Sequence, residues 1–202
     1  MRRLILVSAA AAAVLSSGCF TLSNTIKEET VPPGRLHFGL GALTSDDGAM
    51  PLINLRLGLL ERWDVGTRFD TLGWALDTRL QILTEKTNKV NSVFELGVGT
   101  AFIHTFWYAG VGLGKDLGRL NPYIHVRYMQ STLDLAEMAG ESNNFIVDLL
   151  TRIADEALNV MQVFVGFDME INEKWSITPE IVWVPDLNDL LYFNVALNFR
   201  FW

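Results

Sequence analysis

Hydrophobic and polar residues alternate one by one along most of the chain after residue 35. In the last eleven residues, YFNVALNFRFW, every second residue is apolar from Phe193 onward, and those between are asparagine, alanine or arginine. Such a two-residue period places successive side chains on opposite faces of a β-strand. The pattern predicts strands over residues 36–43, 52–60, 63–71, 74–83, 93–103, 106–114, 122–129, 160–171, 175–184 and 191–202. Most are close to the length of about 9–11 residues that crosses a bilayer at a tilt.

The two faces of these strands differ in charge. The apolar faces carry no charged residue, and a charge there would cost about 2–4 kcal/mol at the middle of a bilayer. The sequence therefore predicts an all-β fold, an antiparallel up-and-down transmembrane β-barrel of about ten strands, within a range of eight to twelve. A soluble periplasmic β-sandwich shows the same alternation when its apolar faces meet in a core, and this alternative stays open.

The opposite faces carry charges of both signs, which we expect to form a polar network in the lumen. Its basic members other than histidine are all arginine, which pairs with carboxylates through two parallel hydrogen bonds, and a small barrel has little open lumen. A packed network is thus favoured over a small diffusion pore. The predicted network residues are Arg56, Asp64, Arg68, Asp70, Asp77, Arg79, Glu95, His125, Arg127, Asp168, Glu170, Glu180 and Arg200. The many glycines on these faces would make room for long neighbouring side chains.

Tryptophans lie close to the ends of several predicted strands. Trp175 and Trp183 bracket one apolar face eight residues apart, which is roughly 26 Å along a strand and close to the height of a lipid-facing band. Aromatic residues at such positions are typical of interfacial girdles. The predicted girdle consists of Trp63, Trp107, Trp175, Trp183 and Trp202.

The N-terminal segment has the features of an export signal. Residues 1–18 contain Arg2 and Arg3, an apolar run and then small residues, as signal peptides do. The following LSSGC resembles a bacterial lipoprotein signal, which implies that Cys19, the sole cysteine, becomes the lipidated first residue. The alternative is ordinary cleavage that leaves a free thiol. We expect a signal peptide at 1–18, a lipidated N-terminal tether at 19–34 and an outer-membrane barrel at 35–202.

The C-terminal strand resembles the last strand of bacterial outer-membrane barrels. That strand commonly ends in an aromatic residue and is read by the barrel assembly machinery, so the resemblance implies an assembly signal at Phe199, Phe201 and Trp202. Repeated hairpins such as LINLRLGLLERWDVGTRFD also resemble a broad group of small exported barrel proteins. This resemblance implies the fold and export through the inner membrane to the outer membrane, with outer-membrane lipid as a partner, and no particular activity.

The longest predicted connection spans residues 130–159 and is expected on the extracellular side. Within it, Ile146, Leu149 and Ile153 recur at helical spacing, which predicts a short amphipathic helix. This helix would either cover the barrel mouth or bind an unknown partner. Replacing Leu149 and Ile153 with aspartate would separate these roles. If the helix covers the mouth, the substitution should lower the stability of the barrel, and unchanged stability would count against that role.

The remaining chemistry in the sequence is sparse. The chain has 202 residues and a net charge of −7, and its acidic balance without a basic patch argues against nucleic-acid binding. The Asp-x-His dyad of omptin proteases and the His-x-Ser arrangement of lipid A deacylases are both missing around His37, His104 and His125. No metal-ligand spacing or cofactor motif occurs. We expect a lipid-anchored barrel with a structural, interaction or minor transport role, with an outer-membrane lipid-modifying enzyme as an alternative.

Overall fold

The computed structural model describes residues 29–45, 48–70, 73–84, 88–101, 104–133, 158–186 and 190–201. The predicted signal peptide, Cys19, the loop helix with Ile146, Leu149 and Ile153, and Trp202 lie outside the described residues.

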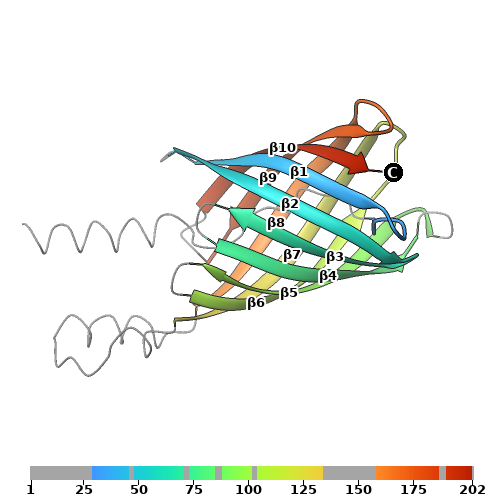
Figure 1. Cartoon of the computed structure of the whole chain (residues 1–202). Helices are drawn as coiled ribbons and strands as arrows, with labels where there is room; N and C mark the ends of the chain where they lie inside the picture. Colours follow the sequence, from blue (N-terminus) through green and yellow to red (C-terminus); the bar gives the residue numbers. More distant parts are fainter. Residues whose placement is uncertain are drawn as a thin grey trace, which may run out of the picture.

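The described residues form ten antiparallel strands that close into a barrel (Figure 1). Every strand pairs with its neighbours in sequence, and the first strand also pairs with the last, with Leu36 opposite Phe201. The bounds are β1 Leu36–Ser45, β2 Gly48–Leu60, β3 Trp63–Asp70, β4 Gly73–Leu83, β5 Asn91–Ala101, β6 His104–Gly114, β7 Leu120–Leu133, β8 Leu158–Glu170, β9 Trp175–Val184 and β10 Leu190–Phe201. The predicted ten-stranded up-and-down barrel is confirmed, and closure of one sheet on itself makes the β-sandwich alternative wrong.

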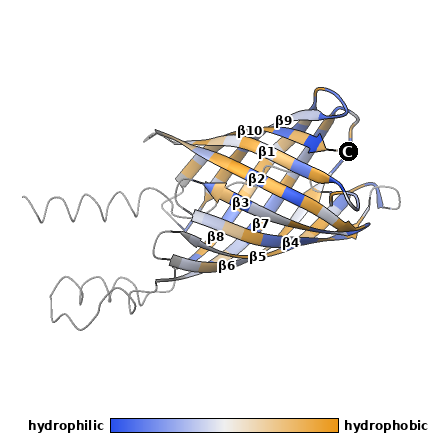
Figure 2. Cartoon of the chain, in the orientation of Figure 1, coloured by the Kyte–Doolittle hydropathy of each residue, from blue (hydrophilic) through white to orange (hydrophobic). Residues whose placement is uncertain are grey.

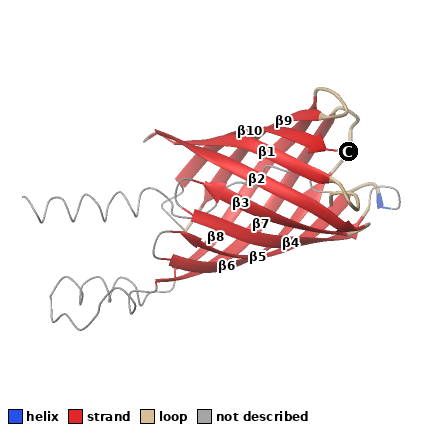
Figure 3. Ribbon diagram, in the orientation of Figure 1, coloured by secondary structure: helices blue, strands red, loops and turns tan. Residues whose placement is uncertain are grey.

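Strands make up almost all of the described chain (Figure 3). We call the end at which β1 begins and β10 ends the near end, and the opposite end the far end. The predicted boundaries were too short at the far end, where β2 begins at Gly48 instead of residue 52. Pro51, which precedes the predicted strand, pairs with Ala42 of β1, while β3 already ends opposite Leu52. A proline is tolerated there because it has no β3 neighbour that needs its missing N–H.

The outer wall of the barrel is apolar along its length. Figure 2 shows hydrophobic and polar positions interspersed along the strands, and side chains such as Leu40, Leu76 and Val195 are about half exposed. This large exposed apolar surface is the reverse of a water-soluble protein and is typical of a barrel with lipid around it. No helix among the described residues is long and apolar enough to cross a membrane.

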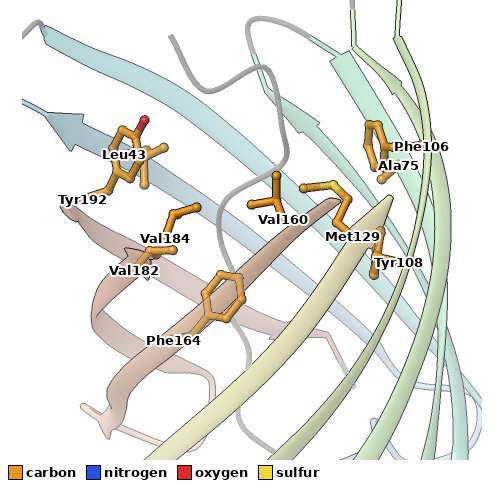
Figure 4. Close-up of a cluster of buried hydrophobic side chains, with 10 residues drawn as sticks. All are labelled: Leu43, Ala75, Phe106, Tyr108, Met129, Val160, Phe164, Val182, Val184 and Tyr192. Carbon is orange, nitrogen blue, oxygen red and sulfur yellow. The ribbon is translucent and has the colours of Figure 1, made fainter. Parts of the chain in front are cut away.

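The interior is not polar throughout, and here the predicted polar lumen needs correction. Toward the far end, buried apolar side chains from seven strands form a cluster (Figure 4). Its members are Leu43, Ala75, Phe106, Tyr108, Met129, Val160, Phe164, Val182, Val184 and Tyr192. The buried ion pairs occupy the middle and the near half of the barrel, so the interior has an apolar layer toward the far end and an ionic layer next to it.

Candidate functional site

The ionic layer is a continuous network of buried side chains from β2 to β7. Its arginines and carboxylates show 0–1% side-chain exposure. A two-residue period brings them to the inner face, and the antiparallel register sets them side by side. Arg56 lies beside Gly66 on β3, which is itself opposite Asp77 on β4, and Arg79 on β4 is opposite Asp64 and Glu95.

Asp64 and Asp77 hold the first part of the network. Arg79 binds Asp64 through two hydrogen bonds, from Nε to Oδ1 at 3.2 Å and from Nη2 to Oδ2 at 2.9 Å. Arg56 donates to Asp64 with one terminal nitrogen and to Asp77 with the other. Arg68 continues the chain, since its Nε donates to Asp77 Oδ2 at 3.1 Å. The pairs are charge-assisted, and each guanidinium bridges neighbouring strands.

Glu95 on β5 gathers the other end of the network. Arg68 Nη2 donates to its Oε1, and Arg127 donates to its Oε2 from Nε at 3.2 Å and from Nη2 at 2.9 Å. His125 Nε2 also lies 3.2 Å from Oε2. One carboxylate thus contacts basic groups from β3 and β7, which lie on either side of it around the barrel.

Tyr108 on β6 joins the ionic layer to the apolar cluster and was not predicted as a site residue. Its hydroxyl donates to Asp77 Oδ2 at 3.2 Å. Its ring centroid is 4.5 Å from the guanidinium carbon of Arg127 and 5.5 Å from that of Arg68, within the range of cation–π contact. The sequence did contain the information: Trp107 is predicted to face outward, and the next residue on a strand faces the opposite side, which places Tyr108 inward.

Glycines on neighbouring strands make room for the largest inner side chains. A Cβ at Gly97 would lie 2.1 Å from the Tyr108 ring, and one at Gly66 would lie 2.6 Å from the Arg56 guanidinium. A Cβ at Gly110 would similarly meet His125 at 2.4 Å. The expectation that inner glycines accommodate long neighbours is therefore confirmed at these positions.

A second polar group lies on β8 to β10. Arg200 binds Glu170 Oε1 at 2.9 Å and Asp168 Oδ2 at 3.1 Å, and Asp168 also accepts a hydrogen bond from Thr178 at 2.8 Å. Glu180 accepts one from the Tyr123 hydroxyl at 2.7 Å. The predicted residues are thus divided between two groups instead of forming one.

Asp70, the remaining predicted network residue, lies at the far end of β3. Its Oδ1 accepts a hydrogen bond from the backbone N–H of Gly73 at 2.8 Å. It is only partly buried, so its described contact is to the hairpin that joins β3 to β4.

The tryptophans lie on the outer wall close to the two ends of the strands. Trp63 and Trp175 begin their strands at the near end, and Trp183 lies at the far end of β9. Trp107 donates from Nε1 to Gln130 at 3.1 Å, and its ring lies 5.9 Å from that of Tyr128. Trp74, at the far-end start of β4 and 40% exposed, was missed, although it continues the period of Leu76.

The C-terminal aromatic residues contact one another at the near end. The Phe199 ring lies 4.5 Å from that of Trp175 and 4.3 Å from that of Phe201. The last two described residues of β10 pair with Leu36 and His37, where the barrel closes.

The residues just before β1, predicted as the end of a tether, lie against the inner wall at the near end. Thr30 and Val31 are buried, with 4% and 0% exposure. The backbone N–H of Val31 donates to Asp64 Oδ2 at 2.8 Å, and Arg79 donates to the backbone oxygen of Glu29 at 3.0 Å. Asp64 therefore connects the network to the N-terminal segment.

These groups are arranged for packing more than for chemistry. Acids and bases in the network are paired with each other, and the described residues contain no group of His, Cys, Asp and Glu side chains that could hold a metal ion. Arg56, Arg68 and Arg127 bind carboxylates on other strands, so the layer cross-links β2 to β7 across the interior of the barrel.

A closed antiparallel barrel with an apolar outer wall and a buried ionic interior has the architecture of a transmembrane β-barrel. No protein-family model matches the chain, and no curated protein matches it. The solved structures similar to it include the NanC porin, at 12% identity and TM-score 0.49 over 81% of this chain and 97% of that one.

Two further structures show a similar architecture. The KdgM porin matches at 5% identity and TM-score 0.46, covering 82% of this chain and 99% of that one. The outer membrane protein OprG from Pseudomonas aeruginosa matches at 8% identity and TM-score 0.37, covering 87% and 99%. At these values no residue role, ligand or activity is carried over to this chain.

Proposed function

We propose that the protein is an outer-membrane β-barrel with a closed lumen, which acts as a non-enzymatic, membrane-embedded scaffold and does not conduct solutes. The observation that carries the proposal is the ion-pair network, in which Arg56, Arg68 and Arg127 cross-link strands β2 to β7 at 0–1% exposure.

The network opposes the small-pore alternative on energetic grounds. Breaking a buried ion pair by removing one partner costs about 3–5 kcal/mol, so opening a path through several shared pairs would cost more. The apolar cluster toward the far end adds a second layer that disfavours hydrated ions. Two different barriers therefore lie in series along the lumen.

The outer wall supports placement in a bilayer. Over β1 to β6 it carries a groove of about 710 Å³, whose lining includes the apolar side chains of Leu57, Leu76 and Val98. These apolar side chains cannot hydrogen-bond to water, whereas lipid chains can pack against them. Tryptophans near both ends of the strands support the same placement.

Planar-bilayer recording of the refolded mature chain tests the closed lumen. We expect no stepwise conductance from protein that runs as a faster band on an unboiled SDS gel than on a boiled one. Discrete, reproducible steps from such folded protein would overturn the scaffold proposal in favour of a pore.

Lipidation of Cys19 is part of the same proposal and is tested separately. We expect labelled palmitate to enter the wild-type protein and not the Cys19→Ala variant, while both need detergent for extraction. If the variant became soluble without detergent, the barrel would not be the membrane-spanning part, and the outer-membrane proposal would fail.

A further inference from the structure

Residues 29–34 lie against the inner wall at the near end of the barrel, with Thr30 and Val31 buried, and contact residues of three strands. We call this segment the N-terminal plug. It begins at β2, where Gly34 N–H donates to the Gly58 oxygen at 2.9 Å and Pro33 forms a parallel bridge with Gly58. These contacts extend the β1 edge of β2, where Gly58 N–H also donates to the Arg35 oxygen, and the segment then turns inward over Gly58.

From β2 the plug runs across β3 toward β4. Val31 donates its backbone N–H to Asp64 on β3 at 2.8 Å. The Thr30 hydroxyl donates to Gln81 Oε1 on β4 at 2.9 Å. Arg79, also on β4, donates to the Glu29 oxygen at 3.0 Å. Backbone groups of the plug are therefore satisfied by side chains of the wall, in the way a bound extended peptide is.

Gly58 is the position that makes this contact close. A Cβ there would lie 2.1 Å from the backbone oxygen of Pro32 and 2.3 Å from that of Val31. Both obstacles are backbone atoms, which cannot rotate away as a side chain can. Any other residue at position 58 would therefore displace the plug, although a β-strand accepts alanine elsewhere.

We propose that the near end of the barrel is a binding site for an extended peptide, and that its ligand is the chain's own residues 29–34. Gly58, Asp64, Gln81 and Arg79 make up this site. Asp64 binds Arg56 and Arg79 as well as the plug, so occupancy of the site and the geometry of the ion-pair network are linked. The proposal does not depend on the closed lumen or on lipidation of Cys19.

The test measures whether residue 31 is protected in the folded full-length chain. In a Cys19→Ser background, a single cysteine is placed at Val31, which is fully buried, or at Pro33, which is exposed. Each protein is treated with a maleimide–polyethylene glycol reagent in detergent, and the mass shift is followed on gels. We expect Val31→Cys to react at least tenfold more slowly than Pro33→Cys.

Adding Gly58→Ala should abolish this difference, because the new Cβ displaces the plug. Gly41→Ala on β1, whose Cβ would meet its nearest atoms at 3.2 Å, should leave it intact. Equal rates at the two cysteines with Gly58 present would overturn the proposal. Protection that survives Gly58→Ala would also overturn it, because the plug could not then be seated against that residue.

A second variant covers the case in which Gly58→Ala does not fold. Thr30 lies outside the strands and is only 4% exposed. The large ring of Thr30→Trp should therefore expel the plug, while the barrel still folds and runs as the faster band without boiling. Fast reaction of Val31→Cys in this folded variant supports the proposal, and continued protection contradicts it.

Discussion

Glu95 shows how much of the interior depends on a single side chain. Its two oxygens contact Arg68 and Arg127 directly, with Arg56 at 4.0 Å and His125 at 3.2 Å. Removing its charge would take away the carboxylate that Arg127 binds and one of the two carboxylates that Arg68 binds, the other being Asp77. A buried charge without a partner is far more costly than an absent pair.

Glu95→Gln should therefore lower the free energy of unfolding by about 3–5 kcal/mol. The measurement is the urea midpoint in detergent, followed by tryptophan fluorescence. The matched control is Glu170→Gln, which breaks a pair with Arg200 at a glutamate that is 27% exposed, where the expected change is about 0–1 kcal/mol. Similar shifts in the two variants would show that the network does not stabilise the barrel.

At the scale of the strand, the pairing of glycine with a large neighbour defines the inner surface. Gly97 on β5 faces Tyr108 on β6 in register, and the ring covers the position that a Cβ would occupy. The ring also lies within cation–π distance of Arg68 and Arg127, and its hydroxyl donates to Asp77.

Gly97→Ala should destabilise the barrel by about 1–3 kcal/mol through overpacking, and most of this loss should disappear when Tyr108 is already alanine. The double-mutant cycle from urea midpoints should give a coupling of about 1 kcal/mol or more. Gly41→Ala, whose new Cβ would have Ala196 Cβ and the Val195 oxygen as its nearest atoms at 3.2 Å, provides the uncoupled comparison. Additive effects at Gly97 and Tyr108 would contradict the proposed contact.

Strand number, order and outward faces could be predicted because the two-residue period is local and lipid excludes charge from one face. The content of the inner face could be predicted only in part. Phe164 and Val182 lie inward toward the far end, and alternation cannot distinguish an apolar lumen from an apolar exterior where both faces are hydrophobic. The division of the charges into two groups depends on register around the barrel, which no single strand reveals.

The N-terminal plug was beyond sequence reasoning for a similar reason. Its residues include two prolines and a glycine, which predict an extended connection correctly. Where that connection lies depends on a cavity that exists only after β2, β3 and β4 have assembled. The one local clue was Gly58, a glycine at an inward position near the end of its strand.

For the whole molecule, the outer wall decides which solvent the barrel tolerates. Leu96 is the central residue of β5 and is 45% exposed, while Leu117 lies in a near-end turn and is 57% exposed. In a bilayer the two residues would have different surroundings. Leu96 lies at mid-height of the wall, where it would contact lipid chains, and Leu117 lies beyond the end of the strands.

Leu96→Arg should lower the free energy of unfolding in lipid vesicles by about 2–4 kcal/mol, and Leu117→Arg by about 0–1 kcal/mol. The readout is the fraction of folded, faster-migrating protein at increasing urea. A barrel surrounded by water would tolerate both substitutions equally, so matching curves would argue against a membrane-spanning wall.

The plug also changes how far Cys19 is held from the barrel. Cys19 is sixteen residues from Arg35 but only ten from Glu29, so its greatest reach falls from about 55 Å to about 35 Å. For a flexible chain, the effective concentration at the attachment point scales roughly as the −3/2 power of length, which gives a gain of about twofold. Any group carried by Cys19 would therefore attach within about 35 Å of Glu29, where the plug contacts β4, instead of within about 55 Å of the start of β1.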